Sequence, residues 1–448
     1  MKVYFDTLGC LKNLSDSDMA QGMLEAAGHS IVTTPGEADA IVVNTCGFID
    51  DAKRESIDEI FTMAEYKDLG KKLIVTGCLV QRYAKELAAE IPEADAFLGV
   101  NDYEMLPAIL DQLSAGSLAE RTYQREAAPD ALERESRYRK IGAHPYTAPL
   151  RIAEGCDNHC TYCIIPKIRG SYRSRPIESL VEEAERLAAA GTKELQIIAQ
   201  DTGCYGKDLY GKPRLADLLT ALCRVGGIAW IRLMYCYEEN IGDDLIAVMA
   251  GEPKICHYID IPLQHGSGKV LREMNRKSTP DSIRRTLTRL RTAMPDICIR
   301  TTFMVGFPGE TEEDYEALLD LVEEQRFDRL GAFAYSREEG TPAAARADQV
   351  PEEVKQDRLD GLMTLQMEIS RSRNEALVGT VQEVMVDGPD EDGRSMLGRT
   401  RRDAPEIDDG VVFTPLRDHL AGDLVRVKIL DAFDYDLEGV EVEDEPAQ

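Results

Sequence analysis

Short apolar runs alternate with amphipathic stretches through the first third of the chain. Residues 2–8, 39–45 and 72–76 are rich in β-branched and aromatic side chains, as buried strands are. Helical spacing follows each run, at 17–27, 50–66 and 80–91. Asp50 stands where an N-cap is expected. Strands that alternate with helices predict an α/β domain with a doubly wound parallel sheet.

The middle of the chain repeats the same alternation six times. Strands are predicted at 149–153, 194–201, 230–235, 258–263, 298–307 and 329–336. Helices are predicted at 177–190, 215–225, 243–249, 269–274, 282–294 and 312–324. Six β/α units are too few to close a full barrel, so we expect an open, partial (β/α)6 barrel. Its site should lie at the C-terminal mouth of the strands.

The last seventy residues change to short β-type runs punctuated by Gly and Asp. A connecting helix is predicted at 352–375, followed by strands at 378–386, 395–399, 411–416, 423–430 and 437–442. Five short strands predict a small antiparallel β-barrel. The expected domains are therefore residues 1–118, a linker at 119–146, residues 147–374 and residues 375–444.

Composition narrows the class of protein. Across 448 residues, 43% are hydrophobic, which is ample for packed cores. No run of eighteen apolar residues and no basic-then-apolar leader is seen, so neither a membrane span nor a secretion signal is predicted. The eleven cysteines cluster in short motifs, which indicates metal ligation in a reducing compartment such as the cytoplasm rather than a disulfide framework.

The net charge of -29 argues against broad binding of nucleic acid, which needs a basic surface. It suits a basic partner, or simply a well-solvated protein. From residue 375 onward there are 20 Asp or Glu and 7 Lys or Arg, a net of -13. A small barrel with this charge should repel RNA.

Three cysteines, Cys156, Cys160 and Cys163, have the spacing C-x3-C-x2-C directly after the first strand of the middle domain. Three thiolates are one short of the four that a 4Fe–4S cluster takes. The fourth iron would be open to a small molecule, as the open position of a catalytic zinc site is. The alternatives at this point are a zinc knuckle or chance clustering.

Three further cysteines follow the predicted strands of the first domain. Cys10, Cys46 and Cys78 each stand beside a glycine at a strand end. Ligands of such sheets bind at the carboxyl ends of the strands, so these distant residues should converge on one crevice. The prediction is a second iron–sulfur cluster with an open iron. The alternative is three buried structural cysteines, which are common in protein cores.

Polar residues and glycines end several strands of the middle domain. Gln200 and Asp201 follow the second strand, and Gln264 precedes His265 after the fourth. The glycines Gly306 and Gly309 follow the fifth and would let the backbone approach a ligand closely. These are the candidate cofactor contacts. Spacing alone favours a plain helix start at Pro308–Thr311 as much as a cofactor contact. His265 alone is more often structural than catalytic.

The Cys156 loop, with the aromatic Tyr162 before its last cysteine, resembles the signature of the radical S-adenosylmethionine (SAM) superfamily. The whole chain resembles the methylthiotransferases of that superfamily, which join a cluster domain, a radical SAM core and a C-terminal TRAM barrel. The motifs that carry the resemblance are Gly9-Cys10, Asn44-Thr45-Cys46, Thr76-Gly77-Cys78, the Cys156 loop, Phe303 to Glu310 and Phe333 to Ser336. Lys12-Asn13 and the segment Asp260 to His265 are similar to the ribosomal-protein branch. Glu238 departs from the Pro that is usual after Tyr237.

The resemblance implies two 4Fe–4S clusters, and SAM as the source of both a methyl group and a radical. Cys156, Cys160 and Cys163 would hold the SAM-cleaving cluster, and Cys10, Cys46 and Cys78 the auxiliary cluster that carries the sulfur. Tyr162, Gln264 and Gly306 would lie near SAM. No protein acid or base is implied, because the clusters carry the chemistry.

The implied substrate is the β-carbon of an aspartate in ribosomal protein twelve of the small subunit. That protein is basic and would dock on the acidic barrel, while an electron donor and a sulfur source complete the partners. Two rival hypotheses remain at this stage. One is a transfer-RNA methylthiotransferase acting on a modified adenosine, and the other is a non-catalytic iron–sulfur electron carrier.

Overall fold

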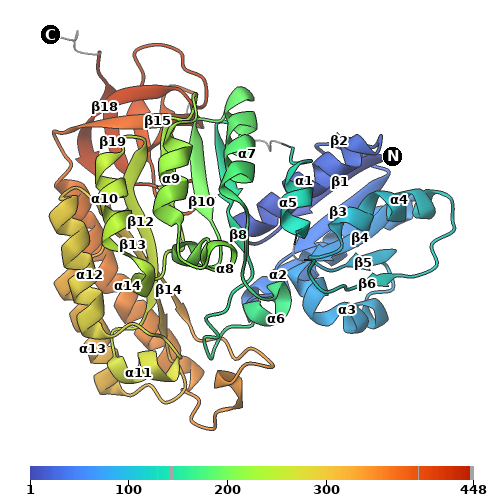
Figure 1. The fold of residues 1–448 in the computed structure, drawn as a ribbon, viewed down its shortest axis with the longest axis horizontal. Helices are drawn as coiled ribbons and strands as arrows, with labels where there is room; N and C mark the ends of the chain where they lie inside the picture. The colour runs from blue at the N-terminus through green and yellow to red at the C-terminus, as the bar shows by residue number, and fades with distance from the viewer. Residues whose placement is uncertain (129, 141–144, 392, 444–448) are drawn as a thin grey trace.

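The structure is a computed structural model that describes residues 1–128, 130–140, 145–391 and 393–443. Parts of the predicted linker (129 and 141–144) and residue 444 lie outside the described residues. Figure 1 shows three bodies: the N-terminal sheet on the right, the larger middle sheet with its helices on the left, and the C-terminal barrel above the latter.

The N-terminal domain is the predicted doubly wound parallel sheet. Its strand order is β2-β1-β3-β4-β5-β6, and every pairing is parallel. The strands are β1 (Lys2–Thr7), β2 (Ser30–Val32), β3 (Ala40–Thr45), β4 (Lys72–Gly77), β5 (Ala96–Leu98) and β6 (Thr122–Tyr123). The helices are α1 (Leu11–Ala26), α2 (Asp50–Ala64), α3 (Cys78–Glu90) and α4 (Leu106–Ser114). The last strand, β6, comes from the stretch that was predicted as a linker.

Two local predictions in this domain were wrong. Helix α1 begins at Leu11 rather than near Ser17, because its first turns bury polar side chains such as Asn13 and Asp16 and so carry no apolar periodicity. The N-cap of α2 is Ile49, not Asp50, and no side chain caps that helix. Asp50 lies in the first turn instead, where its carboxylate pairs with Lys53 and suits the positive end of the helix dipole.

The middle domain is the predicted open sheet, with strand order β14-β13-β12-β11-β10-β7 and only parallel pairings. Its strands are β7 (Thr147–Arg151), β10 (Glu194–Ile198), β11 (Trp230–Leu233), β12 (Ile255–Gln264), β13 (Cys298–Val305) and β14 (Arg329–Ala334). Its main helices are α7 (Ile177–Ala189), α9 (Leu215–Cys223), α10 (Asp243–Gly251), α11 (Gly268–Glu273), α12 (Pro280–Ala293) and α13 (Glu312–Gln325). A short antiparallel pair, β8 (Ala153–Glu154) and β9 (Arg173–Ser174), and the helices α6 (Ile165–Arg169) and α8 (Lys207–Tyr210) complete it. Helix α5 (Ala131–Ser136), in the predicted linker, packs against the N-terminal domain.

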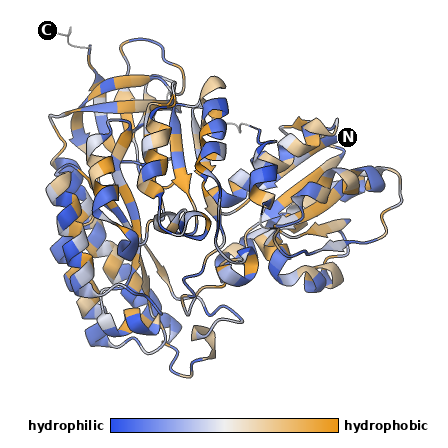
Figure 2. Cartoon of the chain, viewed as in Figure 1, coloured by the Kyte–Doolittle hydropathy of each residue, from blue (hydrophilic) through white to orange (hydrophobic). Residues whose placement is uncertain are grey.

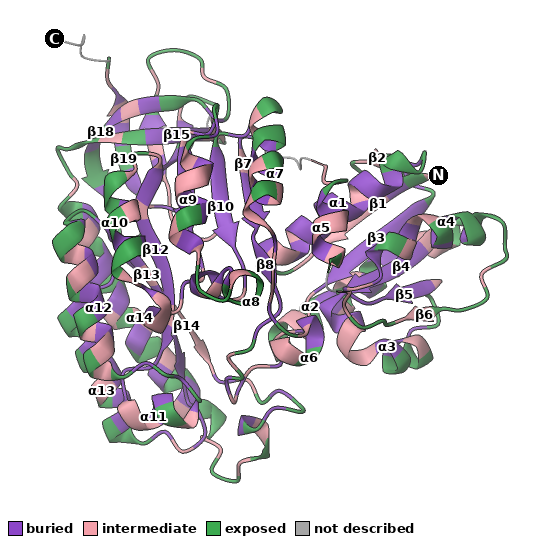
Figure 3. Ribbon diagram, viewed as in Figure 1, coloured by how far each residue is buried: buried purple, intermediate pink, exposed green. Residues whose placement is uncertain are grey.

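The two faces of this sheet differ in polarity because side chains alternate along each strand. Leu195 and Ile197 of β10 pack under the helices in the largest apolar cluster. The alternate positions, such as Gln196 and Arg300, line a cavity on the other face. Figure 2 shows the apolar strands between hydrophilic outer helix surfaces, and Figure 3 shows the same strands buried. The inner face is therefore the side suited to polar chemistry.

The C-terminal segment begins with the long helix α14 (Glu352–Glu375), which matches the prediction. A closed barrel follows, in the order β15-β16-β17-β19-β18. Its strands are β15 (Val381–Pro389), β16 (Met396–Thr400), β17 (Val411–Thr414), β18 (Leu424–Ala432) and β19 (Leu437–Glu441). All its pairings are antiparallel except β17 with β19, which is parallel. Within the described part of the chain, no helix has the length and apolar character that crossing a bilayer requires.

A buried ion triad joins the barrel to the middle domain. Glu194, the first residue of β10, accepts from Arg232 Nε at 2.7 Å and from Arg399 Nη1 of β16 at 2.8 Å. All three side chains are buried. The two guanidinium groups hold the pKa of Glu194 below its ordinary value although burial opposes them. The barrel therefore sits at the N-terminal ends of the core strands.

We expect Glu194→Gln to destabilise the protein by about 3–5 kcal/mol, because it leaves the buried Arg232 guanidinium without a counter-charge and Arg399 with Asp387 alone. The stabilisation depends on the ionised carboxylate. Since the folded pKa is depressed, it is present above the unfolded pKa of about 4.3 and is lost as the pH falls through the folded value. Urea unfolding at neutral pH measures the loss. Glu185→Gln on the exposed side of α7 is the matched control. Equal midpoints for the two variants would contradict the role of the triad.

Candidate functional site

The structure brings Cys10, Cys46 and Cys78 to the carboxyl ends of three neighbouring strands. Cys46 and Cys78 directly follow β3 and β4, while Cys10 follows β1 after the Leu8-Gly9 turn. Gly9 has φ +93° and packs so closely that a Cβ there would lie 2.9 Å from the Cβ of Cys46. The close approach of these loops requires glycine at this position. The predicted convergence is thus present, with Cys10 exposed and Cys78 buried.

Arg169 ties this cysteine group to the middle domain. Its Nη2 donates to Cys78 Sγ at 3.2 Å and to Asn13 Oδ1 at 3.0 Å. Its Nη1 lies 2.9 Å from Asp16 Oδ2 and 3.3 Å from Glu154 Oε2. Only 3% of the Arg169 residue surface is exposed. Burial raises the pKa of the Cys78 thiol to about 12, and the guanidinium opposes that rise.

The other cysteine group occupies the loop between β8 and α6. Cys156 and Cys160 are buried and Cys163 is half-buried. Burial raises the pKa of Cys156 to about 11 and of Cys163 to about 12, while backbone N–H donors at Asn158 and Ile165 lower these two values. Protonated thiols of this kind release their protons when a metal centre binds. Because α6 is only five residues long, it places Cys163 before its start and Arg169 at its end.

Sequence reasoning missed a cluster of polar and aromatic residues beside Cys160. Tyr162 and Cys160 pack in one buried group, with the partly buried Tyr237 against it. The Arg276 guanidinium stacks on the Tyr237 ring, 3.8 Å from its centroid. Arg276 Nη2 donates to Pro262 O, but its buried Nε and Nη1 find no partner among the described residues. A single arginine in a polar loop carries no sequence signal that could have identified it.

Gln200, Asp201 and Gln264 fall at strand ends as predicted, but their surroundings differ. Gln200 donates to Glu154 Oε1 at 2.6 Å, and its own Oε1 is buried without a partner in the described part of the chain. Gln264 has φ +73° and likewise leaves its Oε1 unpartnered there. Asp201 accepts from Asn158 Nδ2 at 3.0 Å and from Asn240 Nδ2 at 2.9 Å. Asp201 thus holds the cysteine loop in place through Asn158.

Gly306 and Gly309 pack against the segment that leads into α14 and against that helix. A Cβ on Gly306 would lie 2.2 Å from Lys355 Cγ, and one on Gly309 would lie 2.6 Å from Asp348 Oδ2. Both have positive φ values, +71° and +78°. The structure therefore gives both glycines a packing role, and their assignment as cofactor contacts stays a prediction.

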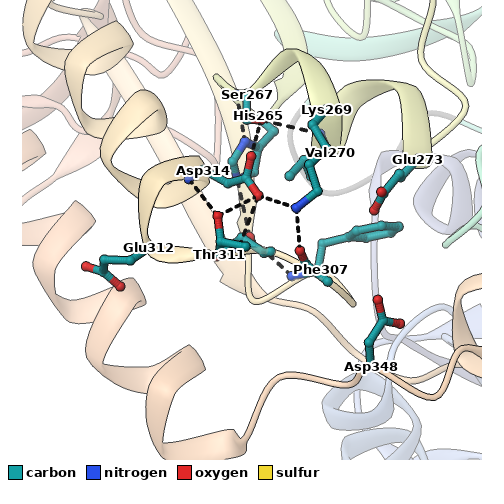
Figure 4. A network of polar contacts seen from close by, with 12 residues as sticks. His265, Ser267, Lys269, Val270, Glu273, Phe307, Thr311, Glu312, Asp314 and Asp348 are labelled. Atoms are coloured by element: carbon teal, nitrogen blue, oxygen red, sulfur yellow. Dashed lines mark hydrogen bonds and ion pairs between the residues drawn. The ribbon is translucent and has the colours of Figure 1, made fainter.

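Figure 4 shows a network of polar contacts near the start of α13, in which Asp314 stands between Lys269, Ser267 and Thr311. His265 Nε2 lies 3.2 Å from Glu310 Oε2, and its Nδ1 accepts from the Ser267 backbone. Asp314 accepts from Lys269 Nζ at 2.7 Å and from the backbone N–H of Thr311 at 3.0 Å, as part of the capping box of α13. The histidine and the Pro-Gly-Glu-Thr turn are thus structural here.

No group of three or more His, Cys, Asp or Glu within the described residues is placed to hold a single metal ion. In a 4Fe–4S cluster each cysteine binds a separate iron, so its ligands need not converge on one point. The other five cysteines lie apart from the two groups in sequence, as buried thiols (Cys236, Cys256 and Cys298) or half-buried ones (Cys204 and Cys223).

Three family profiles match successive parts of the chain. Residues 2–99 match the Uncharacterized protein family UPF0004, residues 150–322 match the Radical SAM superfamily and residues 378–442 match the TRAM domain. These ranges correspond to the N-terminal sheet, the middle sheet and the C-terminal barrel. The predicted three-part organisation is confirmed in this coarse sense, while the individual domain limits stay predictions.

Solved structures show the fold. The radical SAM methyltransferase TsrM from Kitasatospora setae, solved with a tryptophan substrate and a SAM analogue, has a TM-score of 0.57 at 13% identity and covers 84% of this chain and 90% of that one. The cobalamin-dependent SAM radical enzyme OxsB has a TM-score of 0.51 at 15% identity, over 82% of this chain and 56% of that one.

Full-length relatives are much more similar. The protein named ribosomal protein uS12 methylthiotransferase RimO from Lachnoclostridium phytofermentans is 49% identical over 98% of this chain and 99% of its own length. The proteins of the same name from Geobacter sulfurreducens and Clostridioides difficile are each 48% identical over 98% of both chains. Identity at this level along the whole length establishes the family. The chain belongs to the RimO family of radical SAM methylthiotransferases.

Proposed function

We propose that this protein transfers a methylthio group to the β-carbon of an aspartate in the basic ribosomal protein uS12. Bound 4Fe–4S clusters and SAM would supply the radical, the sulfur and the methyl group. Cys156, Cys160 and Cys163 would hold the SAM-cleaving cluster, and Cys10, Cys46 and Cys78 the auxiliary one. The chain's own side chains bind, orient and shield these groups.

The observation that carries the proposal is the placement of α6 between the two cysteine groups. Cys163 precedes this helix, and Arg169 at its end donates to Cys78. Donors to the ligand sulfurs are a recurrent feature of iron–sulfur sites, because they stabilise thiolate charge. The donor sets also fit: each has three thiols, Gly9 packs closely on Cys46, and backbone N–H groups donate to Cys156 and Cys163. A substrate between the two groups would be within reach of both.

Unpartnered polar atoms of Arg276, near Cys160, and of two glutamines at strand ends suit the amino-acid and ribose ends of SAM. Arg276 Nε and Nη1 are donors suited to a carboxylate, and the Oε1 atoms of Gln264 and Gln200 are acceptors suited to ammonium or hydroxyl groups. An unsatisfied buried polar atom is costly, so a ligand that pairs with these atoms gains affinity. Tyr162 would pack beside the bound SAM, as the sequence suggests.

Two observations favour a protein substrate over an RNA substrate: the acidic charge of the C-terminal segment and the name that the relatives share. The C-terminal segment carries a net charge of -13 from residue 375 onward, and its loop residues Pro405, Glu406 and Ile407 line the cavity on the inner face of the core sheet. An acidic surface attracts a basic protein and repels a phosphate backbone. The relatives' shared name points to the same substrate. We place the reaction in the cytoplasm, with an electron donor and a sulfur source as further partners.

Removing the guanidinium of Arg169 should make the auxiliary cluster harder to reduce. A hydrogen bond to a charged group contributes roughly 1.5–3 kcal/mol, and about 1.4 kcal/mol corresponds to about 59 mV for a one-electron couple. In Arg169→Met we therefore expect the reduction potential to fall by up to about 60–130 mV. Potentiometric titration followed by electron paramagnetic resonance measures it, in a background that carries Cys156→Ala, Cys160→Ala and Cys163→Ala.

Arg186→Met, exposed on α7, is the control with the same loss of charge. A potential that is the same in both variants would show that Arg169 serves only to join the domains.

The proposed substrate is tested by offering two substrates to the reconstituted protein in parallel. Anaerobic incubations with SAM and a reductant would contain either uS12 or unmodified transfer RNA, and mass spectrometry would read both products. We expect a methylthio gain on one aspartate of uS12 and none on the RNA. A methylthio gain on an adenosine of the RNA instead would show that the protein acts as a transfer-RNA methylthiotransferase. Two loaded clusters without any SAM cleavage would favour the electron carrier.

A further inference from the structure

A cavity of about 460 Å³ lies where the three domains meet. Cys10 and Leu14 line it from the N-terminal domain, Tyr235 and Arg300 from the core, and Glu406 from the C-terminal barrel. The cavity thus connects the exposed cysteine of the N-terminal group with the inner face of the core sheet. A substrate side chain that entered it would stand beside Cys10.

Lys12 lies beside this cavity, against the ring of Tyr235 that forms part of its wall. It lies in the first turn of α1, two residues after Cys10, and its Nζ stands 4.3 Å from the centroid of the Tyr235 ring. No carboxylate of the described residues is within ion-pair distance of this amine. The other cations of the cavity wall are already neutralised. Arg300 pairs with Asp260 at 2.9 Å, and Arg139 pairs with Asp18 at 3.2 Å.

Backbone contacts fix the position of Tyr235, whose ring lies under the Lys12 ammonium. Its backbone has φ +53°, a conformation that is rare for an aromatic residue. Its N–H donates to Asp260 Oδ2 at 3.2 Å, and its C=O accepts from the Thr202 N–H at 3.0 Å. A strained residue fixed in this way indicates a functional constraint. The ring keeps the ammonium close to the cavity wall without neutralising it.

We propose that the cavity is the binding site for the acidic side chain of the protein substrate, with the Lys12 ammonium paired to its carboxylate. This inference rests on the proposed function and names a residue that selects the substrate. Asp18 and Glu406 also line the cavity, and Asp18 is paired with Arg139. The Lys12 ammonium, which has no ion-pair partner among the described residues, is therefore the cation that can offset Glu406 and favour entry of a carboxylate beside Cys10. A neutral side chain or an uncharged base would leave the ammonium unpaired.

The test compares binding of uS12 with binding of its Asp→Asn variant at the target position. Cluster-loaded wild-type protein and Lys12→Met would be titrated without reductant, and the dissociation constants measured by fluorescence anisotropy. We expect Lys12→Met to bind the aspartate form on the order of tenfold to a hundredfold more weakly. It should bind the asparagine form as wild type does. Lys12→Arg should recover most of the affinity.

Lys85→Met, exposed on α3, controls for the change in net charge. Iron content and circular dichroism check that the variants fold. An equal loss for both forms of uS12, or no loss for either, would overturn the inference while leaving the function intact. Wild-type protein that neither binds nor methylthiolates uS12 would instead overturn the proposed function and the inference with it.

Discussion

Cys160→Ala is expected to abolish the cleavage of SAM while leaving the auxiliary cluster in place. Two cysteines cannot hold a cube that needs three protein ligands, and Cys160 is a buried cysteine of the loop that packs with Tyr162. Formation of 5′-deoxyadenosine should fall to background, and bound iron should fall by about half. Both are measured on anaerobically reconstituted protein, by liquid chromatography and by metal analysis.

Cys223→Ala is the control for this variant. Cys223 ends α9 and is a half-buried thiol outside both cysteine groups, so its loss should change neither measurement. Production of 5′-deoxyadenosine by Cys160→Ala at the wild-type rate would show that the SAM-cleaving site lies elsewhere.

Cys46→Ala should separate the two halves of the reaction. The Cys156 group is intact in this variant, so SAM cleavage continues, but no sulfur is delivered and the methylthio product falls to background. Cys46 lies between its partners, because β3 is flanked by β1 and β4. The measurement is the ratio of methylthiolated uS12 to 5′-deoxyadenosine by mass spectrometry.

Gly9 packs on Cys46, so the loss of product must be distinguished from local unfolding. Cys46→Ser keeps the size of the side chain and should show the same loss. Normal product from either variant would refute the auxiliary cluster at this position.

Features that depend on neighbouring residues in the sequence, such as helix ends and cysteine spacing, could be predicted from the sequence. Helix α14 has its expected bounds because its ends are marked by Pro351 and by the change to β-type sequence. The six cysteines were identifiable because their spacing and their place at strand ends reflect chemistry directly. The early start of α1 was missed because tertiary contacts bury its polar residues, which outweighs the apolar pattern.

Residues that act through long-range contacts escaped prediction. Arg169 reaches Cys78 across 91 positions of sequence, and Arg276 meets Tyr237 only in the folded core. Gly306 was expected near a cofactor, and that contact stays a prediction, because close packing and a cofactor contact both explain a glycine at a strand end. The structure shows Lys355 against it. The parallel pairing of β17 with β19 likewise depends on barrel closure, which no local pattern encodes.

The most direct test of the account is the mass of modified uS12 after one turnover with SAM whose methyl group is fully deuterated. If both cysteine groups act on one substrate, a single aspartate should lose one hydrogen and gain one sulfur together with the deuterated methyl group. One 5′-deoxyadenosine should accompany each product. A gain of the deuterated methyl group without sulfur would contradict the account. So would a product that, even after repeated turnover, carries sulfur with an unlabelled methyl group only.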